Sequence, residues 1–301
     1  MLQAIVKRSV IGLLAGLLLA PTFISSSARA IDDSSESITL SPVSKRYELD
    51  AGSATSDSFK ILNTGAVGYN FIVYARPYAI INSDYANPNY ADAAGNVANA
   101  DAYKWAQFSQ TTYHLNPGES LDVPFTLRVP AGTTPGGHYG VLFAETQSDN
   151  SDGSAVTRNK RVGLVIYATV KGSYITGVEV AQPSAQFMQL NPPLTANASI
   201  KNTGNTDFLA HVTYAVSDVF GNVKYNDEKD YAVLPGTTRA MSLQWQAAPS
   251  FGLFQTEVRI KALDKEVVNK SYVFMAPFWF YGLVAVLLVG GILYAMARRK
   301  R

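Results

Sequence analysis

The chain has 301 residues, 47% of them hydrophobic and none of them cysteine, so disulfides, thiolate metal sites and thiol catalysis are all excluded. Seven of its 25 basic residues lie in the first 30 and last four positions, which leaves 18 basic against 23 acidic residues between 31 and 277. That net charge of −5 gives no basic footprint for nucleic acid. About 250 residues between two apolar ends are enough for two domains of ordinary size.

The amino-terminal segment has the pattern of a secretory signal peptide. Lys7 and Arg8 precede an apolar run from Val10 to Ala20, and Ala28-Arg29-Ala30 is a small-x-small cleavage site. We therefore expect residues 1–30 to be removed during export, with a retained membrane anchor as the alternative.

Short runs of alternating apolar residues fill the chain between its two ends. In LDVPFTLRV, residues 121–129, every second side chain is apolar, which is the period of a half-buried strand. The same alternation occurs at 69–77, 162–170 and 256–262, and long helical periods are absent. These patterns predict an all-β body made of antiparallel sandwiches.

Three features recur in one order along this body. Asn63-Thr64-Gly65 returns as Asn202-Thr203-Gly204, and both Asn and Gly tolerate positive φ, so each tripeptide can close a tight reversal. A Pro-Gly turn then follows in LNPGES and again in VLPGTT, and GGHYGVLFAE is answered by FGLFQTEV. We predict two tandem Ig-like β-sandwich domains, at residues 31–172 and 173–275.

The first copy is longer than the second in one place. The spacing from Asn to Pro is 54 residues between 63 and 117 but 33 between 202 and 235, and the extra residues fall in the polar, Tyr-containing stretch 81–105. Loops longer than about 12–15 residues are usually functional or disordered. We therefore look first to this excursion for a binding surface, with a solvated, mobile loop as the alternative.

The carboxyl-terminal segment has the features of a membrane span. Phe278 to Ala297 is a stretch of 20 residues without charge, and at about 1.5 Å per residue it spans roughly 30 Å. Aromatic residues at 278–281 suit a membrane interface, and the basic tail 298–301 suits the cytoplasmic side. We expect a transmembrane helix at 276–297, an extracellular ectodomain and a cytoplasmic carboxyl terminus; a buried helix is the alternative.

Catalytic and metal-binding motifs are missing from the sequence. His114, His138 and His211 stand far apart, and no Gly-x-Ser-x-Gly elbow, Walker loop or GxGxxG is present. We therefore predict no enzymatic activity, no metal and no cofactor. A pair of catalytic carboxylates is defined by spatial rather than sequence separation, so an exported glycan-processing enzyme remains an alternative.

The first half carries an ordered string of motifs. These are an opening Ser-Pro in ITLSPVSKRYELDAG, a Pro-Gly turn, Val-Pro, a Gly-Gly-x-Tyr strand and a final apolar strand, RVGLVIYATVKG. Over residues 36–172 the chain resembles the WxL-interacting protein family of bacterial surfaces, in its amino-terminal peptidoglycan-binding domain. The resemblance implies cell-wall glycan as a ligand of the first domain and a partner protein for the second, although residues 174–274 show no distinctive motif.

Together these observations indicate a non-catalytic, membrane-anchored cell-surface protein that binds peptidoglycan, a partner surface protein or both. An assembly or structural protein without glycan affinity is the alternative. Aromatic rings bring a large contact area at low entropic cost, and arginine can join them. The candidate ligand-binding residues are therefore Tyr74, Arg76, Tyr78, Tyr85, Tyr90 and Trp105.

Overall fold

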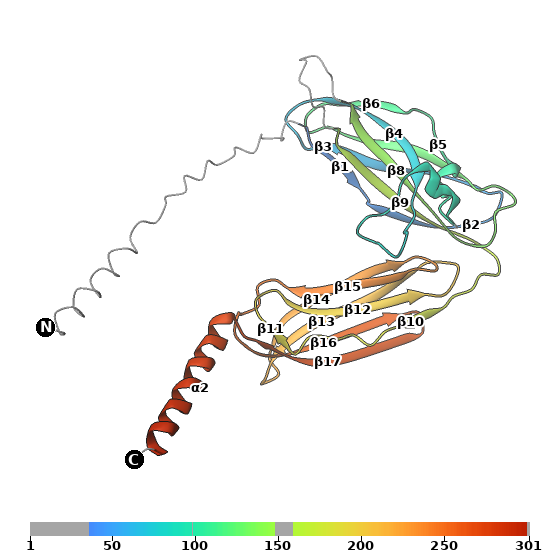
Figure 1. The fold of residues 1–301 in the computed structure, drawn as a ribbon. Helices are drawn as coiled ribbons and strands as arrows, with labels where there is room; N and C mark the ends of the chain where they lie inside the picture. Colours follow the sequence, from blue (N-terminus) through green and yellow to red (C-terminus); the bar gives the residue numbers. More distant parts are fainter. Residues whose placement is uncertain (1–35, 98, 148–158, 300–301) are drawn as a thin grey trace. The chain divides into compact units, whose positions relative to one another are not determined.

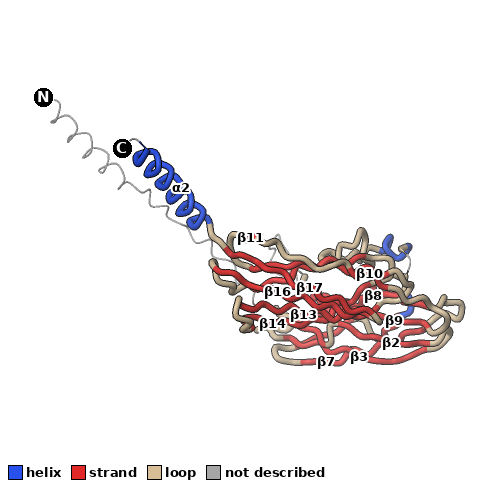
Figure 2. Tube along the Cα trace, turned by 90° about the horizontal axis from the view of Figure 1, so that it is seen from below, coloured by secondary structure: helices blue, strands red, loops and turns tan. Residues whose placement is uncertain are grey.

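The computed structural model describes residues 36–299 except residue 98 and residues 148–158. The predicted signal peptide, residues 1–30, and the last two residues of the basic tail lie outside the described residues. Strands dominate the described chain, as predicted, and its regular helices are two short 3₁₀ segments and one carboxyl-terminal α-helix (Figures 1 and 2).

The first half of the chain forms two facing sheets, which we call the first sandwich. The strands of the four-stranded sheet are, in order, β1 (Ile38–Ser41), β3 (Ala54–Asn63), β7 (Ser120–Arg128) and β5 (Ala106–Phe108). The strands of the five-stranded sheet are β2 (Ser44–Leu49), β9 (Arg161–Val170), β8 (Gly136–Gln147), β4 (Tyr69–Pro77) and β6 (Thr112–Leu115). All neighbours are antiparallel except β2 and β9.

The predicted alternation builds the core of this sandwich. Val123, Phe125 and Leu127 of β7 are buried, and they share one apolar cluster with Leu164 and Ile166 of β9 from the opposite sheet. Burying such a side chain contributes about 1.5–3 kcal/mol each. The strand predictions at 69–77, 121–129 and 162–170 are therefore confirmed.

The second half forms another pair of sheets, the second sandwich, with an apolar cluster of its own. The strands of its three-stranded sheet are β10 (Val178–Val180), β12 (Leu194–Asn202) and β15 (Thr238–Trp245). The strands of its five-stranded sheet are β11 (Met188–Gln189), β17 (Lys265–Met275), β16 (Gly252–Ala262), β13 (Phe208–Asp218) and β14 (Val223–Val233). The predicted strand at 256–262 is part of β16.

A buried asparagine closes the turn that leaves β3. The Nδ2 of Asn63 donates to the carbonyl oxygens of Val67 at 2.8 Å and Leu115 at 3.3 Å. Its Oδ1 accepts from the backbone N–H of Gly65 at 2.9 Å. One side chain thereby shapes the turn and ties it to the end of β6.

The same arrangement returns at the end of β12. The Nδ2 of Asn202 donates to the carbonyl oxygens of Thr206 and Val233, both at 2.8 Å, and its Oδ1 accepts from Gly204 N–H at 2.8 Å. No residue of either Asn-Thr-Gly has a positive φ. The prediction that backbone freedom closes these reversals was therefore wrong: a buried amide closes each one by satisfying three backbone groups.

The Pro-Gly turns do use left-handed backbone, as predicted. Gly118 has φ 75° and Gly236 has φ 67°, conformations that residues with a Cβ rarely adopt. The N–H of Gly118 donates to Asn63 O at 2.9 Å, and that of Gly236 donates to Asn202 O at 3.1 Å. The sequence repeat is therefore also a repeat of hydrogen bonding.

Most of the excursion of the first half has defined structure. It contains two 3₁₀ segments, η1 (Asp92–Asn96) and η2 (Ala102–Trp105). An isolated bridge between Ala79 and Asn89 closes its first loop. Figure 1 shows it as the teal segment beside β8 and β9.

The chain described ends in α2 (Phe278–Arg299), which begins and ends two residues later than the predicted span 276–297. Its part from Phe278 to Met296 has a mean hydropathy of 2.0 and is not buried against the rest of the protein. By length and composition this helix is able to cross a bilayer, while insertion and orientation stay predictions.

Candidate functional site

The outer face of the five-stranded sheet of the first sandwich carries aromatic and basic side chains. Side chains alternate along a strand, so Tyr74 and Arg76 of β4 lie on the face opposite the core. The register places Tyr74 beside Phe143 of β8, and Glu145 of β8 beside Arg161 of β9. Residues from three strands thus meet on one surface.

Guanidinium groups lie over the rings of this surface. The Cζ of Arg161 is 4.3 Å from the ring centroid of Phe143 and 5.8 Å from that of Tyr90, and the Cζ of Arg76 is 5.3 Å from that of Tyr74. Tyr90 comes from the excursion and meets Phe143 edge to face at 5.1 Å between centroids. We call these five residues the aromatic–arginine face.

A glycine opens the space that the Phe143 ring occupies. A Cβ at Gly163 of β9 would lie 2.8 Å from both the Phe143 ring and a methyl group of Val141. Any larger residue would push the ring off the sheet, and Arg161 with it. Gly163 is therefore a packing requirement of the aromatic–arginine face.

Acidic partners fix the orientation of the face. The hydroxyl of Tyr74 donates to Glu145, and the Nη1 of Arg76 donates to Asp92 Oδ1 at 2.9 Å. Burial first, and the hydrogen bond to Glu145 second, raise the pKa of Tyr74, so its hydroxyl stays a protonated donor. The face is held in one arrangement before any ligand arrives.

Another part of the excursion contacts the second sandwich. The hydroxyl of Tyr85 accepts from Leu234 N–H at 2.8 Å and lies 2.5 Å from Thr237 Oγ1. Ser83 Oγ accepts from Thr238 N–H at 2.9 Å, and Arg239 Cζ lies 4.4 Å from the Tyr85 ring. Tyr85 thus belongs to the junction between the sandwiches.

A buried carboxylate completes this junction. Asp207, whose side chain is 1% exposed, forms an ion pair with Arg46 and accepts a hydrogen bond from Tyr139 Oη at 3.0 Å. Arg46 also lies over the ring of Tyr167 at 4.4 Å. Burial, then the charge and hydrogen bond of Asp207, raise the pKa of Tyr139, so this hydroxyl also remains a donor.

The six predicted site residues therefore separate into three groups. Tyr74, Arg76 and Tyr90 come together in the aromatic–arginine face, whereas Tyr85 lies in the junction. Tyr78 and Trp105 are buried, at 8% and 3% exposure, so their rings present no face at the surface. Tyr85 and Tyr90 of the excursion are both partly buried by their ring contacts.

Trp105 packs against the first core and a buried histidine. Its ring centroid is 5.0 Å from that of His138, which is bonded at both nitrogens: Nδ1 lies 2.7 Å from Asp101 Oδ1, and Nε2 lies 2.9 Å from Thr134 O. Burial lowers the pKa of His138, but these two hydrogen bonds outweigh it and leave the pKa raised. His138 fastens the end of the excursion to β8.

Phe143 and Arg161 were missed from the sequence. Arg161 occupies an outward position of the alternating strand β9, so the pattern RVGLVIY carried a signal for it. β8 is buried on both faces from Gly136 to Ala144, so its sequence carried no such signal for Phe143. The pattern could not place them beside Tyr74, because strand register depends on contacts across the sheet.

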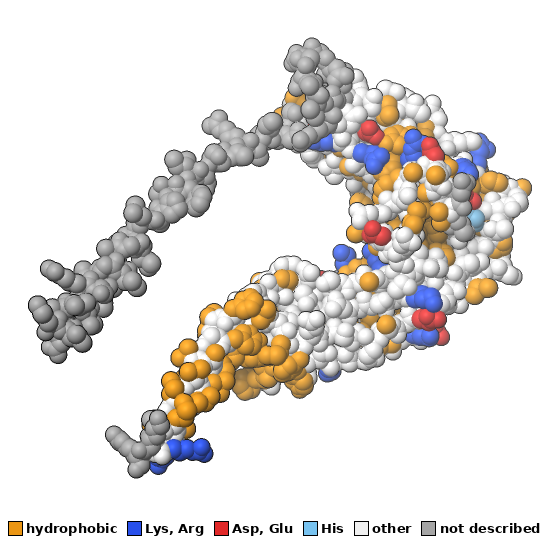
Figure 3. Space-filling view, viewed as in Figure 1, with side chains coloured by type: hydrophobic (Ala, Val, Ile, Leu, Met, Phe, Trp, Pro, Cys, Tyr) orange, Lys and Arg blue, Asp and Glu red, His pale blue; other side chains and the backbone are white. Residues whose placement is uncertain are grey.

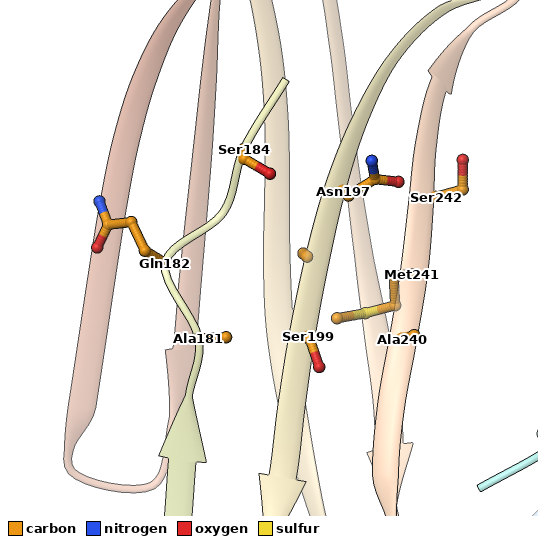
Figure 4. A pocket seen from close by; sticks show the side chains of 9 residues that line it. Ala181, Gln182, Ser184, Asn197, Ser199, Ala240, Met241 and Ser242 are labelled. Atoms are coloured by element: carbon orange, nitrogen blue, oxygen red, sulfur yellow. The ribbon is translucent and has the colours of Figure 1, made fainter. Parts of the chain in front are cut away.

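A second surface feature is a shallow groove of about 450 Å³ on the three-stranded sheet of the second sandwich. β10 ends at Val180, and the chain leaves β12 before returning at a bridge between Ser184 and Asn197. The lining side chains are uncharged, and apart from Gln182 and Met241 they are small (Figure 4). The groove offers a few hydroxyl and amide groups but no charged or aromatic anchor.

Among the described residues, no three His, Asp or Glu side chains lie close enough together to hold a metal ion. The predictions of no metal, no cofactor and no catalysis stay predictions.

No protein-family model and no curated protein matches the chain. Among solved structures, the class 5 fimbriae chaperone CfaA is 12% identical over 79% of this chain and 99% of its own, with a TM-score of 0.39. The E. coli chaperone DraB is 9% identical over 78% and 98%, with a TM-score of 0.38. The CsuC–CsuE chaperone and tip adhesion subunit complex of Acinetobacter baumannii gives 13% over 78% and 97%, with a TM-score of 0.38. Similarities of this size assign neither a function nor a partner.

Proposed function

We propose that this chain is a non-catalytic, membrane-anchored surface protein that binds a partner protein through the aromatic–arginine face. The observation that carries the proposal is the preordered cluster on an outward sheet face. Tyr74, Arg76 and Tyr90 are half-buried and Arg161 is exposed, whereas Phe143 is 5% exposed and supports them from beneath. Aromatic and arginine side chains are enriched at protein interfaces and dominate binding hot spots. An ordered cluster also loses less conformational entropy on binding.

The covering of the rings favours a protein over a glycan. A sugar stacks on an open aromatic face, but Arg161 and Arg76 already lie over Phe143 and Tyr74. A protein surface can instead meet the guanidinium edges with carboxylate and carbonyl acceptors while packing beside the rings. Peptidoglycan binding, implied by the resemblance to WxL-interacting proteins, is the competing outcome of the test.

The rest of the architecture fits a surface display role. In this proposal the two sandwiches are Ig-like domains in tandem, exported by the amino-terminal signal and held at the membrane by α2 with the tail inside. Separate apolar clusters support two domains, and the uncharged, unburied length of α2 supports the anchor.

Site-specific photo-crosslinking in intact producing cells tests the proposal. A benzophenone side chain is placed at Ala93, which is exposed beside the face, and in a control at Asp122, which is exposed on the opposite sheet. We expect a discrete protein adduct from position 93 and none from position 122. Absence of any adduct at 93 would overturn the protein-binding proposal.

A pair of arginine variants assigns the binding to the face. Arg161→Ala should remove the adduct, whereas Arg128→Ala, which changes an exposed arginine of β7 on the opposite sheet, should leave it. An adduct that survives Arg161→Ala would place the interface elsewhere. The full-length chain is also tested for retention on insoluble cell wall. If it is retained and Arg161→Ala abolishes the retention, the ligand of this face is a glycan.

A further inference from the structure

The end of the second sandwich from which α2 leaves is formed by several chain segments. Register places Asp218, the last residue of β13, opposite Phe254 of β16, and Gly252 of β16 opposite Met275 of β17. β11 also pairs with the end of β17, through Met188 and Phe274. The turn after β13, the start of β16 and the β11 segment therefore all lie at the α2 end.

Large apolar side chains at this end face solvent. The tip of the β13–β14 turn, Phe220, is 87% exposed, and five more apolar residues of these segments are at least 40% exposed. We call the set the apolar collar, and it comprises Phe187, Met188, Leu190, Phe220, Phe251 and Leu253. Contiguous apolar patches are rare on soluble surfaces and mark protein or membrane contacts.

Charge is missing from most of the segments that form the collar. Residues 181–200, 240–256 and 271–297 contain no Asp, Glu, Lys, Arg or His. Asp218 and Lys224 lie beside the collar and form an ion pair with each other, with 3.1 Å between Lys224 Nζ and Asp218 Oδ2. The edge strand β14 shows the contrast, because it carries five charged residues between 224 and 230.

The collar is continuous with the start of α2. The ring of Phe251 lies 5.1 Å from that of Phe280 and 6.1 Å from that of Trp279, and Phe274 lies 5.7 Å from Phe280. Figure 3 shows hydrophobic side chains running from α2 onto the adjoining end of the sandwich without a charged side chain between them. Aromatic side chains at the ends of a membrane span lie at the level of the lipid headgroups.

From this geometry we infer that the apolar collar lies in the headgroup region of the same membrane that α2 enters, so that the second sandwich is seated on the lipid. The inference rests on the proposed anchoring by α2. Lipid is favoured over a protein occupant because the collar adjoins the point where the helix leaves the sandwich, and because residues 181–200, 240–256 and 271–297 around it carry no charge.

Fluorescence of single labels in the full-length chain tests the inference. The chain has no cysteine, so one introduced residue accepts one nitrobenzoxadiazole label. The labelled variants are Phe220→Cys in the collar, Leu190→Cys as a second collar position, Val286→Cys in α2 and Asp264→Cys in the turn at the opposite end of β16. Each is reconstituted in phosphatidylcholine vesicles with or without lipid carrying a doxyl quencher near the headgroup or at mid-chain.

We expect blue-shifted emission and headgroup-level quenching at positions 220 and 190, mid-chain quenching at 286, and neither effect at 264. Quenching at 286 with none at 220 and 190 would overturn the collar inference and leave the anchor in place. No quenching at 286 would overturn the proposed anchoring itself. If the labels at 220 and 190 are unquenched, and the unlabelled Phe220→Cys and Leu190→Cys variants form disulfide-linked dimers on mild oxidation, the collar contacts a second copy, against the inference.

Discussion

The two buried-asparagine turns share their internal bonds but differ in their surroundings. In each turn the next residue also binds a preceding segment, Thr64 N–H to Ser37 O at 2.9 Å and Thr203 N–H to Gly177 O at 3.0 Å. Five residues after the asparagine, however, the first turn has Gly68 and the second has Asp207.

The second turn uses its extra polar groups to hold the first sandwich. Asn205 O accepts from Gly137 N–H at 2.9 Å, and Asn205 Nδ2 donates to Pro135 O at 3.3 Å. Gly204 is required there, because a Cβ would lie 2.4 Å from Ile175 O. The comparison teaches that one buried amide builds the turn, while the residues after it decide whether the turn also forms a junction.

The largest effect is expected when the shared feature is removed from either turn. Asn63→Ala and Asn202→Ala each remove the side-chain partner of two carbonyls and one N–H, at least one of them buried, so each variant should lose about 2–5 kcal/mol of unfolding free energy in its own sandwich. Urea unfolding of the full-length chain in detergent, followed by circular dichroism, measures the loss.

The exposed Asn197→Ala is the matched control and should change the unfolding free energy by less than about 0.5 kcal/mol. A large loss in one turn with none in the other would break the proposed equivalence of the two asparagines.

The next effect concerns the residue at which the turns differ. A double-mutant cycle with Arg46→Gln and Asp207→Asn should give a coupling energy of about 1–2 kcal/mol, because Asp207 is removed from water. The exposed pair Lys60 and Asp122, 3.9 Å apart, serves as control and should couple by less than about 0.5 kcal/mol. Equal coupling in the two cycles would show that the junction pair contributes no more to stability than an exposed ion pair.

A smaller effect is expected from the excursion, which only the first half possesses. Tyr85→Phe removes the acceptor of the Leu234 N–H, which costs about 1 kcal/mol. Hydrogen exchange at the Leu234 amide should then accelerate about fivefold. Tyr272→Phe, at an exposed tyrosine of β17, should leave that rate unchanged. An unchanged rate in Tyr85→Phe would indicate that the excursion does not close the junction in solution.

The smallest effect is a pH dependence of the excursion's attachment. Because the folded pKa of His138 is raised, its stabilising contribution is fully present below the unfolded histidine pKa of about 6.5 and is lost as pH rises through the folded value. Asp101→Asn should lower the His138 pKa and remove this dependence. Nuclear magnetic resonance titration of the His138 ring measures both; an identical pKa in the variant would contradict the assigned partner.

Much of the fold could be predicted from the sequence, because strands with one buried face have an apolar residue at every second position. The buried positions of β7, β9 and β16, the Pro-Gly turns and the extra length of the first half all follow from spacing. The role of Asn63 and Asn202 did not follow from spacing. An asparagine can shape a turn through a left-handed backbone or through hydrogen bonds of its side chain, and the sequence is the same in both cases.

The site was only partly predictable for a similar reason. Tyr74, Arg76 and Tyr90 were named from their residue types, but Phe143 and Arg161 join them through register, which is a property of paired strands. Tyr78 and Trp105 were named by the same reasoning and are buried, since aromatic residues serve cores and surfaces alike.

The registry of β17 has a mechanical consequence. The linker enters the second sandwich beside Lys265, whose ammonium donates to Val178 O at 2.6 Å, and the chain leaves at Met275 toward α2. A pull on α2 enters the sandwich at Met275 and acts along β17, whose pairing with β16 is continuous from Lys265 to Met275. Such a pull would load the whole ladder in shear at once instead of peeling it bond by bond.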